Sequence, residues 1–258
     1  MIRSPMGKAM WLATSVLLAG CSPDLNGTLR PGEMAEASVN GVPLAIPMAF
    51  VPPHERFLYR RGTQEDGIRV EVNYPAMTPF VDPLDNSPTY LRYQYKLALN
   101  VSTDDHASTA DRVALMRRMV LSAPRDENHG GTFVPGPWGL LRYQWPSHVP
   151  ALTVENFQGF DDDDQFVYPS LEAIETHIRC KPTIFPDAHS AEAQRRRERG
   201  EFTYVPSCGH YFRSNALNDA VVKLSYQRGH LEHRREIQTA AEAFFARHRA
   251  RERILRER

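Results

Sequence analysis

The most concentrated acidic chemistry in this chain is the run Asp161, Asp162, Asp163 and Asp164. Four neighbouring carboxylates repel one another, and a calcium ion would relieve that repulsion through oxygen ligands. The spacing does not match an EF-hand loop, because no glycine stands where the turn needs one. Two other interpretations stay open: a solvated acidic loop, and a surface on which these aspartates contact a basic protein partner.

A basic counterpart is the run of Arg195, Arg196, Arg197 and Arg199, interrupted by one glutamate. A loop with a basic tip would contact an acidic surface or lipid headgroups. A soluble linker or a short polar helix is the alternative. We therefore treat these arginines and the four aspartates as candidate partner-binding residues.

Two smaller groups also carry chemistry. His230, His233 and Glu236 are spaced three apart near the expected start of the last helix, where they would share a face and bind a metal, or form an exposed polar turn. The second group is aromatic and is interleaved with prolines, so it would form a rigid binding surface or pack as core. Its members are Phe133, Trp138, Tyr143 and Trp145.

Familiar catalytic signatures are missing from the sequence. No GxSxG, HExxH, phosphate-loop or dinucleotide-binding motif occurs. A binding protein is therefore favoured over an enzyme. A hydrolase with scattered catalytic residues stays an alternative, with His210 beside Cys208 as its first candidate.

The amino-terminal residues combine the features of an export signal. Arg3 and Lys8 form a positive leading region, and 9–20 is an uncharged, mostly apolar run. A bilayer-spanning helix needs roughly 20 apolar residues, so this run is too short to span. Its length and flanks are typical of a signal-peptide core.

The end of this run, Leu18-Ala19-Gly20-Cys21, resembles the lipobox of bacterial lipoproteins. The resemblance implies cleavage before Cys21, a lipid on its sulfur and a periplasmic body anchored to a membrane. Ser22 implies sorting to the outer membrane, because the aspartate that would favour inner-membrane retention comes only at position 24. Several acyl chains anchor firmly, since each buried methylene contributes about 0.8 kcal/mol.

Cys21 thus carries lipid in this interpretation, which leaves Cys180 and Cys208. In an oxidising periplasm two remaining cysteines most simply form one disulfide. The alternative is a metal site that combines them with His210 and either His177 or His189, although no tight CxxC or HxxxH pair is present.

Composition bounds the partners. The chain has 31 basic and 31 acidic residues; removal of the leader with Arg3 and Lys8 leaves 29 basic against 31 acidic, a net charge of −2. A near-neutral protein without a nucleic-acid-binding motif is not expected to bind nucleic acid. We expect a signal peptide over 1–20, a flexible tether over 21–36 and a single periplasmic domain over 37–258.

Alternating apolar residues dominate the expected domain. Strands are predicted at 68–74, 91–101, 138–145, 151–157, 202–205, 208–213 and 219–227, because apolar and polar residues alternate or apolar residues cluster there. Val39-Asn40-Gly41-Val42 predicts a tight hairpin. A further hairpin is expected around 214–218, which carries turn residues.

Helices are expected at three places: 108–121, a segment that Ser170 would cap and that carries Ile174 and Ile178, and 231–249. The last helix has an apolar stripe formed by Ile237, Ala241, Phe244, Phe245 and His248. Together these patterns predict an α+β fold, mainly an antiparallel sheet with a few peripheral helices and a C-terminal helix that covers one face.

The layout of lipobox, short tether, one mixed domain with charged loops and one cysteine pair resembles immunity lipoproteins of type VI secretion. The resemblance implies a protein that neutralises a secreted toxic effector, such as a phospholipase, by covering its active site. The alternative is a structural or assembly lipoprotein of an envelope or secretion machine. No cofactor is expected apart from the calcium considered above.

Replacing the Cys21 thiol with a hydroxyl tests the lipid attachment. We expect Cys21→Ser to lose incorporation of a labelled fatty acid and the cleaved form on a gel, because serine offers no sulfur for acylation. Cys208→Ser, which removes a thiol elsewhere in the chain, should keep the label. Acylation that survives in Cys21→Ser would contradict the lipobox assignment.

Overall fold

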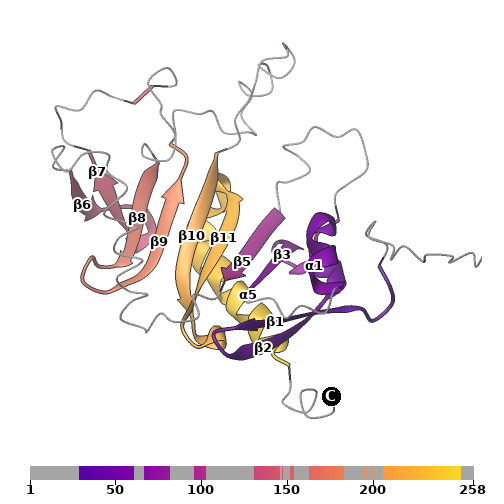
Figure 1. Cartoon of the computed structure of the whole chain (residues 1–258). Helices are drawn as coiled ribbons and strands as arrows, with labels where there is room; N and C mark the ends of the chain where they lie inside the picture. Colours follow the sequence, from indigo (N-terminus) through magenta and orange to yellow (C-terminus); the bar gives the residue numbers. More distant parts are fainter. Residues whose placement is uncertain are drawn as a thin grey trace, which may run out of the picture.

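The computed structural model describes residues 29–60, 67–81, 96–102, 131–145, 147, 152–153, 163–182, 195, 199 and 206–250. Within them the dominant element is a nine-stranded sheet of order β4-β3-β5-β11-β10-β9-β8-β7-β6 (Figure 1). Every neighbouring pair in that sheet is antiparallel. The expected α+β fold, mainly antiparallel sheet, is therefore confirmed in its coarse form, and the sheet outweighs the helices.

The strands and helices follow one another along the chain with these bounds. The strands are β1 (Met34–Val39), β2 (Val42–Pro47), β3 (Gly67–Asn73), β4 (Thr78–Pro79), β5 (Lys96–Ser102), β6 (Thr132–Pro135), β7 (Leu141–Gln144), β8 (Asp164–Pro169), β9 (Ile174–Cys180), β10 (Ser207–Ser214) and β11 (Ala220–Gln227). The α-helices are α1 (Arg56–Arg60) and α5 (Arg234–Arg247), and the 3-10 helices are η1 (Met48–Phe50), η2 (Pro53–Glu55), η3 (Pro137–Gly139), η5 (Asn215–Leu217) and η6 (Arg228–His233).

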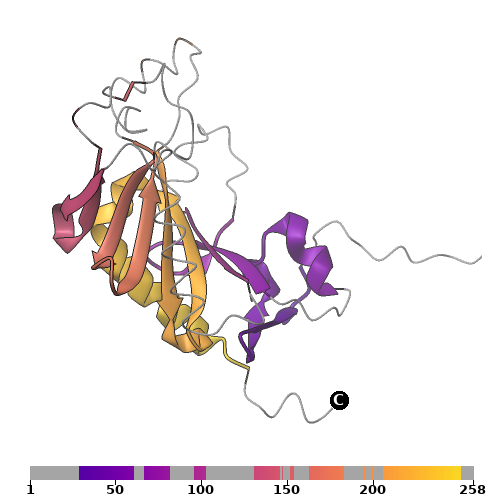
Figure 2. The same ribbon diagram turned by 60° about the vertical axis from the view of Figure 1, so that its left-hand side comes forward.

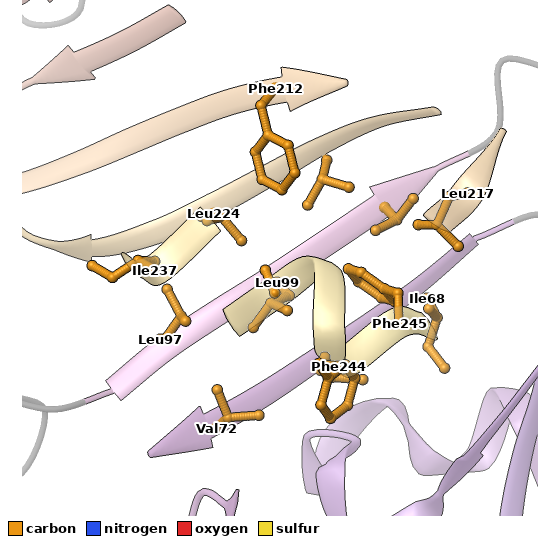
Figure 3. Packing of buried hydrophobic residues seen from close by; sticks show 14 of the residues in the cluster. Ile68, Val72, Leu97, Leu99, Phe212, Leu217, Leu224, Ile237, Phe244 and Phe245 are labelled. Carbon is orange, nitrogen blue, oxygen red and sulfur yellow. The ribbon is translucent and has the colours of Figure 1, made fainter. Parts of the chain in front are cut away.

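Helix α5 lies along one face of the sheet and buries its apolar stripe there (Figures 1 and 2). Ile237, Phe244 and Phe245 are almost fully buried, as is Ala241. Figure 3 shows this stripe against strand residues that point to the same face, among them Val72, Leu97, Leu99, Phe212 and Leu224. The residues between them on each strand point to the other face, so the alternation predicted for β3, β5 and β11 is confirmed where the structure describes it.

The β1–β2 hairpin covers the end of the core near the last turn of α5. Asn40 and Gly41 both have positive φ angles, 52° and 74°, as a two-residue hairpin turn requires. After α5 the chain continues against β2, where Ala45 N donates to His248 O at 2.9 Å. The Asn40 side chain bonds the Asn218 carbonyl, which links this hairpin to the turn between β10 and β11.

The disulfide joins two neighbouring strands of the large sheet. Cys180 on β9 stands directly opposite Cys208 on β10, and the two sulfurs are bonded. Both cysteines are buried. The predicted pairing is therefore confirmed, and the thiolates needed for the alternative metal site are not available.

Several sequence predictions were wrong in type or in bounds. The helix expected after Ser170 is strand β9, because Ile174, Thr176 and Ile178 also alternate, and β-branched residues favour strands. Within the expected strand 138–145, Trp138 and Gly139 have positive φ angles, and strand β7 covers only Leu141–Gln144.

Other differences concern ends of elements. The last helix starts at Arg234 rather than 231, since η6 precedes it. Strand β1 begins at Met34, three residues before the expected domain start, and the salt bridge between Arg60 and Glu33 (2.6 Å) fixes the chain just before it. The predicted elements at 108–121 and 202–205, almost all of that at 151–157, and residues 91–95 lie outside the described residues.

Among the helices that the structure describes, none has the length and apolar composition to cross a bilayer.

Removal of the disulfide should destabilise the fold without changing its topology. We expect Cys180→Ala combined with Cys208→Ala to lower the free energy of unfolding by about 3–4 kcal/mol, because the cross-link between residues 28 apart restricts the unfolded chain. Urea denaturation followed by circular dichroism measures the change. An unchanged midpoint would contradict a stabilising role for this bond.

Candidate protein-interaction site

Trp138, in the turn between β6 and β7, combines an exposed side chain with an unusual backbone conformation. Its side chain is 47% exposed, and its backbone lies in the left-handed region with φ 55° and ψ 28°. A bulky residue in that region is strained by roughly 1–3 kcal/mol and persists only where its surroundings impose it. An exposed, conformationally fixed tryptophan is typical of a binding anchor.

Three contacts impose the Trp138 conformation. Gly136 N donates to Leu140 O at 2.7 Å, and Leu140 N donates to Pro137 O at 3.1 Å, which closes the turn. The Trp138 carbonyl accepts a hydrogen bond from the Arg234 guanidinium at 2.6 Å. The first residue of α5 thus holds a turn that is 96 positions earlier in the chain.

A groove of about 290 Å³ adjoins this turn, between α5 and one end of strands β8, β9 and β10. It is lined by Tyr168, Glu175, Thr176, Arg213, Asn215, Arg234, Arg235, Gln238, Thr239 and Glu242. Arg234 connects the two features, since it lines the groove and its guanidinium donates to the Trp138 carbonyl. Within the groove, the Arg235 guanidinium lies 5.2 Å from the centre of the Tyr168 ring. The turn and the groove therefore form one site.

The groove combines three arginines with two glutamates. Glu242 is already engaged, because it accepts hydrogen bonds from Ser214 Oγ (2.9 Å), Asn215 N (3.2 Å) and Ala216 N (3.1 Å). Arg234 is only 4% exposed, and burial, followed by the nearby charge of Arg235, lowers its pKa from the usual value. The arrangement can recognise negatively charged and aromatic groups.

Half of the acidic run lies in the described residues and forms internal ion pairs. Asp163 is buried beside Lys181 (3.0 Å) and Arg179 (3.8 Å), and burial raises the pKa of its carboxyl. Asp164 pairs with Arg142 (3.2 Å) and Arg228 (2.6 Å). These carboxylates brace the start of β8 next to the disulfide. Asp161 and Asp162 lie outside the described residues.

The predicted basic run is described only at Arg195 and Arg199, where Arg199 N donates to Arg195 O at 3.2 Å. Both side chains are exposed. Arg196 and Arg197 lie outside the described residues, and so does His189. The run therefore stays a candidate partner surface from the sequence.

The histidine groups do not assemble a metal site in the part of the chain that the structure describes. The His230 ring packs against Tyr74, with centroids 5.9 Å apart, and His233 lies 3.4 Å from Glu232. His210 is fully buried and bonds the Tyr226 hydroxyl at 3.1 Å, so it is not accessible to a substrate. The hydrolase alternative loses its first candidate.

The four aromatic residues of the predicted group are not equivalent: three pack against one another and one is exposed. Phe133, Tyr143 and Trp145 pack edge to face, with centroids 5.4 Å and 5.1 Å apart for successive pairs. Of the four, Trp138 alone is exposed. The packing alternative therefore holds for Phe133, Tyr143 and Trp145, whereas Trp138 is available for binding. The sequence signal was Pro137-Trp138-Gly139, because a bulky residue between proline and glycine fits a turn better than a strand.

Comparisons with known proteins give one structural likeness. No family model and no curated protein matches the chain. An immunity protein of the Stenotrophomonas maltophilia type IV secretion system has a solved structure that superposes with a TM-score of 0.58 and 15% sequence identity, covering 87% of this chain and 98% of that chain. At this identity the likeness shows a shared fold.

The two buried histidines should make the protein less stable in mild acid. Burial lowers the pKa of both His177 and His210 to about 3, below the ordinary value of 6.5. Between pH 6.5 and 3 the unfolded chain therefore binds protons that the folded chain does not. The free energy of unfolding decreases as the pH is lowered through this range. The slope approaches roughly 1.4 kcal/mol per pH unit for each histidine.

Urea denaturation at pH 7, 6 and 5 measures this slope. His177→Gln removes one of the two groups and should make the slope shallower by one histidine's share. Equal slopes in the wild type and His177→Gln would contradict the assignment.

Proposed function

We propose that this chain is an immunity protein that binds and neutralises a secreted toxic effector. The observation that carries the proposal is Trp138, displayed in a strained turn that a buried arginine holds beside a charged groove. Strained exposed aromatics are retained at binding sites, because a partner gains their buried area without ordering them. The shared fold with a type IV secretion immunity protein supports the same function.

Neutralisation in this proposal is steric. Trp138 inserts into a pocket on the effector, and the groove contacts polar groups around that pocket, so the effector's active site is covered. Central aromatic residues contribute most of the binding energy in such interfaces, whereas the surrounding contacts mainly exclude water. The function needs no catalytic group on the immunity protein.

Lipid anchoring belongs to the same proposal. A lipid on Cys21 would hold the domain on the periplasmic side of a membrane, in our proposal the outer membrane. The Cys180–Cys208 disulfide supports export, because disulfides persist in oxidising compartments. Anchoring would raise the local concentration of the inhibitor where a membrane-active effector works. A phospholipase delivered by a type VI system is the effector we propose.

Truncation of the exposed anchor should weaken effector binding. We expect Trp138→Ala to weaken the affinity by about thirtyfold or more, the usual effect of removing a central tryptophan from an interface. Val81→Ala is the matched control, because Val81 is 76% exposed and follows β4, at the other edge of the sheet. Both affinities are measured by biolayer interferometry with the immobilised full chain. Equal losses in the two variants would contradict the anchor.

The effector itself is found by affinity capture. The full chain in detergent should retain one secreted toxin, encoded beside its own gene, and periplasmic production of that toxin should kill cells unless the chain is co-produced. Capture of no toxin together with no protection would overturn the proposed function. Stable capture of envelope-machine components instead would favour an assembly lipoprotein.

A further inference from the structure

The groove holds a buried positive charge whose compensation within the described residues is incomplete. A guanidinium carries five N–H donors, and the Trp138 carbonyl accepts from the Nη2 atom of Arg234. Among the described residues, Arg213, Arg234 and Arg235 form no ion pair with a carboxylate within 4 Å. Burying a charge is costly unless it is paired, so this site favours an incoming anion.

The two glutamates of the groove do not supply that pairing. The oxygens of Glu242 accept three hydrogen bonds from the β10 end and η5, which directs its charge toward that turn. Glu175 is exposed at the rim. The groove therefore keeps a local excess of positive charge. The planar guanidinium groups of Arg213 and Arg235 can each donate two parallel hydrogen bonds to a carboxylate.

We infer that the groove between α5 and strands β8–β10 receives an acidic side chain, aspartate or glutamate, from a loop of the effector. This inference deepens the proposed function and rests on it. The recess of about 290 Å³ accommodates one or two side chains. Thr176, Gln238 and Thr239 add polar groups that fix the orientation of the carboxylate.

A protein loop fits the groove better than a lipid surface. A planar anionic membrane would meet the exposed Glu175 at the rim before it reached Arg234, whereas a single side chain can enter the recess beside it. Trp138 next to the groove then gives the effector loop an apolar contact. The hydrogen bond between Arg234 and Trp138 couples the two contacts, so the acidic side chain and the tryptophan pocket are recognised as a pair.

The test uses small probes and does not require the effector. The full chain, labelled with 15N-arginine and held in detergent, is titrated with N-acetylglutamic acid amide and with N-acetylglutamine amide, which has the same shape without the charge. We expect saturable shifts of the Arg213, Arg234 and Arg235 Nε–Hε signals with the glutamate probe, in the millimolar range, and no saturable shift with the glutamine probe.

Variants locate the effect on the groove. Arg235→Gln should weaken binding of the glutamate probe at least about tenfold, whereas Arg247→Gln, which changes another exposed arginine near the end of the same helix, should leave it unchanged. Both variants change surface side chains. Circular dichroism checks that both are folded.

The outcomes separate this inference from the proposed function. The acidic-side-chain inference would be overturned if the glutamate probe gave no saturable response, or if the glutamine probe gave an equal response. It would also be overturned if only inorganic phosphate or vesicles with one-third phosphatidylglycerol gave a response. Capture of the effector would still support the proposed function in each of these cases. Saturable glutamate binding that Arg235→Gln removes supports it. Effector capture that fails would overturn the immunity function and leave the groove as a carboxylate site.

Discussion

The packing of the apolar stripe of α5 on the large sheet is the constraint on which the rest of the structure depends. Ile237, Phe244 and Phe245 are buried against residues of β3, β5, β10 and β11, so the helix has one rotation about its axis. That rotation turns Arg235 and Thr239 toward the ends of β8–β10 and forms one wall of the groove. The same burial that stabilises the domain thus positions the charged side chains of the candidate site.

The start of α5 connects packing to recognition. Arg234 is the first residue of the helix, and it reaches the carbonyl of Trp138 across the sheet edge. A buried guanidinium is costly to desolvate, and here a backbone carbonyl offsets part of that cost while the groove leaves the rest for an anion. The tryptophan turn and the groove are therefore linked, because the buried guanidinium of Arg234 contacts both.

Periodicity predicted the parts of the fold that bury one face. The stripe Ile237, Ala241, Phe244 and Phe245 and the alternation at Leu97 and Leu99 indicated a helix on an antiparallel sheet, because burial imposes those spacings. The Ile174 and Ile178 pair misled, since residues four apart lie on one face of a helix and also of a strand. The groove could not be predicted, because Arg213 and Arg234 approach through tertiary structure and have no spacing that links them.

The position at which β1 begins limits the distance that the domain could reach from a membrane to which Cys21 is attached. Glu33 is tied to Arg60, and the eleven residues 22–32 lie between Glu33 and Cys21. A fully extended chain spans at most about 3.5 Å per residue, so a lipidated Cys21 would hold the body within roughly 40 Å of the bilayer. A domain on so short a tether would reach effectors only in a thin layer next to the lipid, and not in the rest of the compartment.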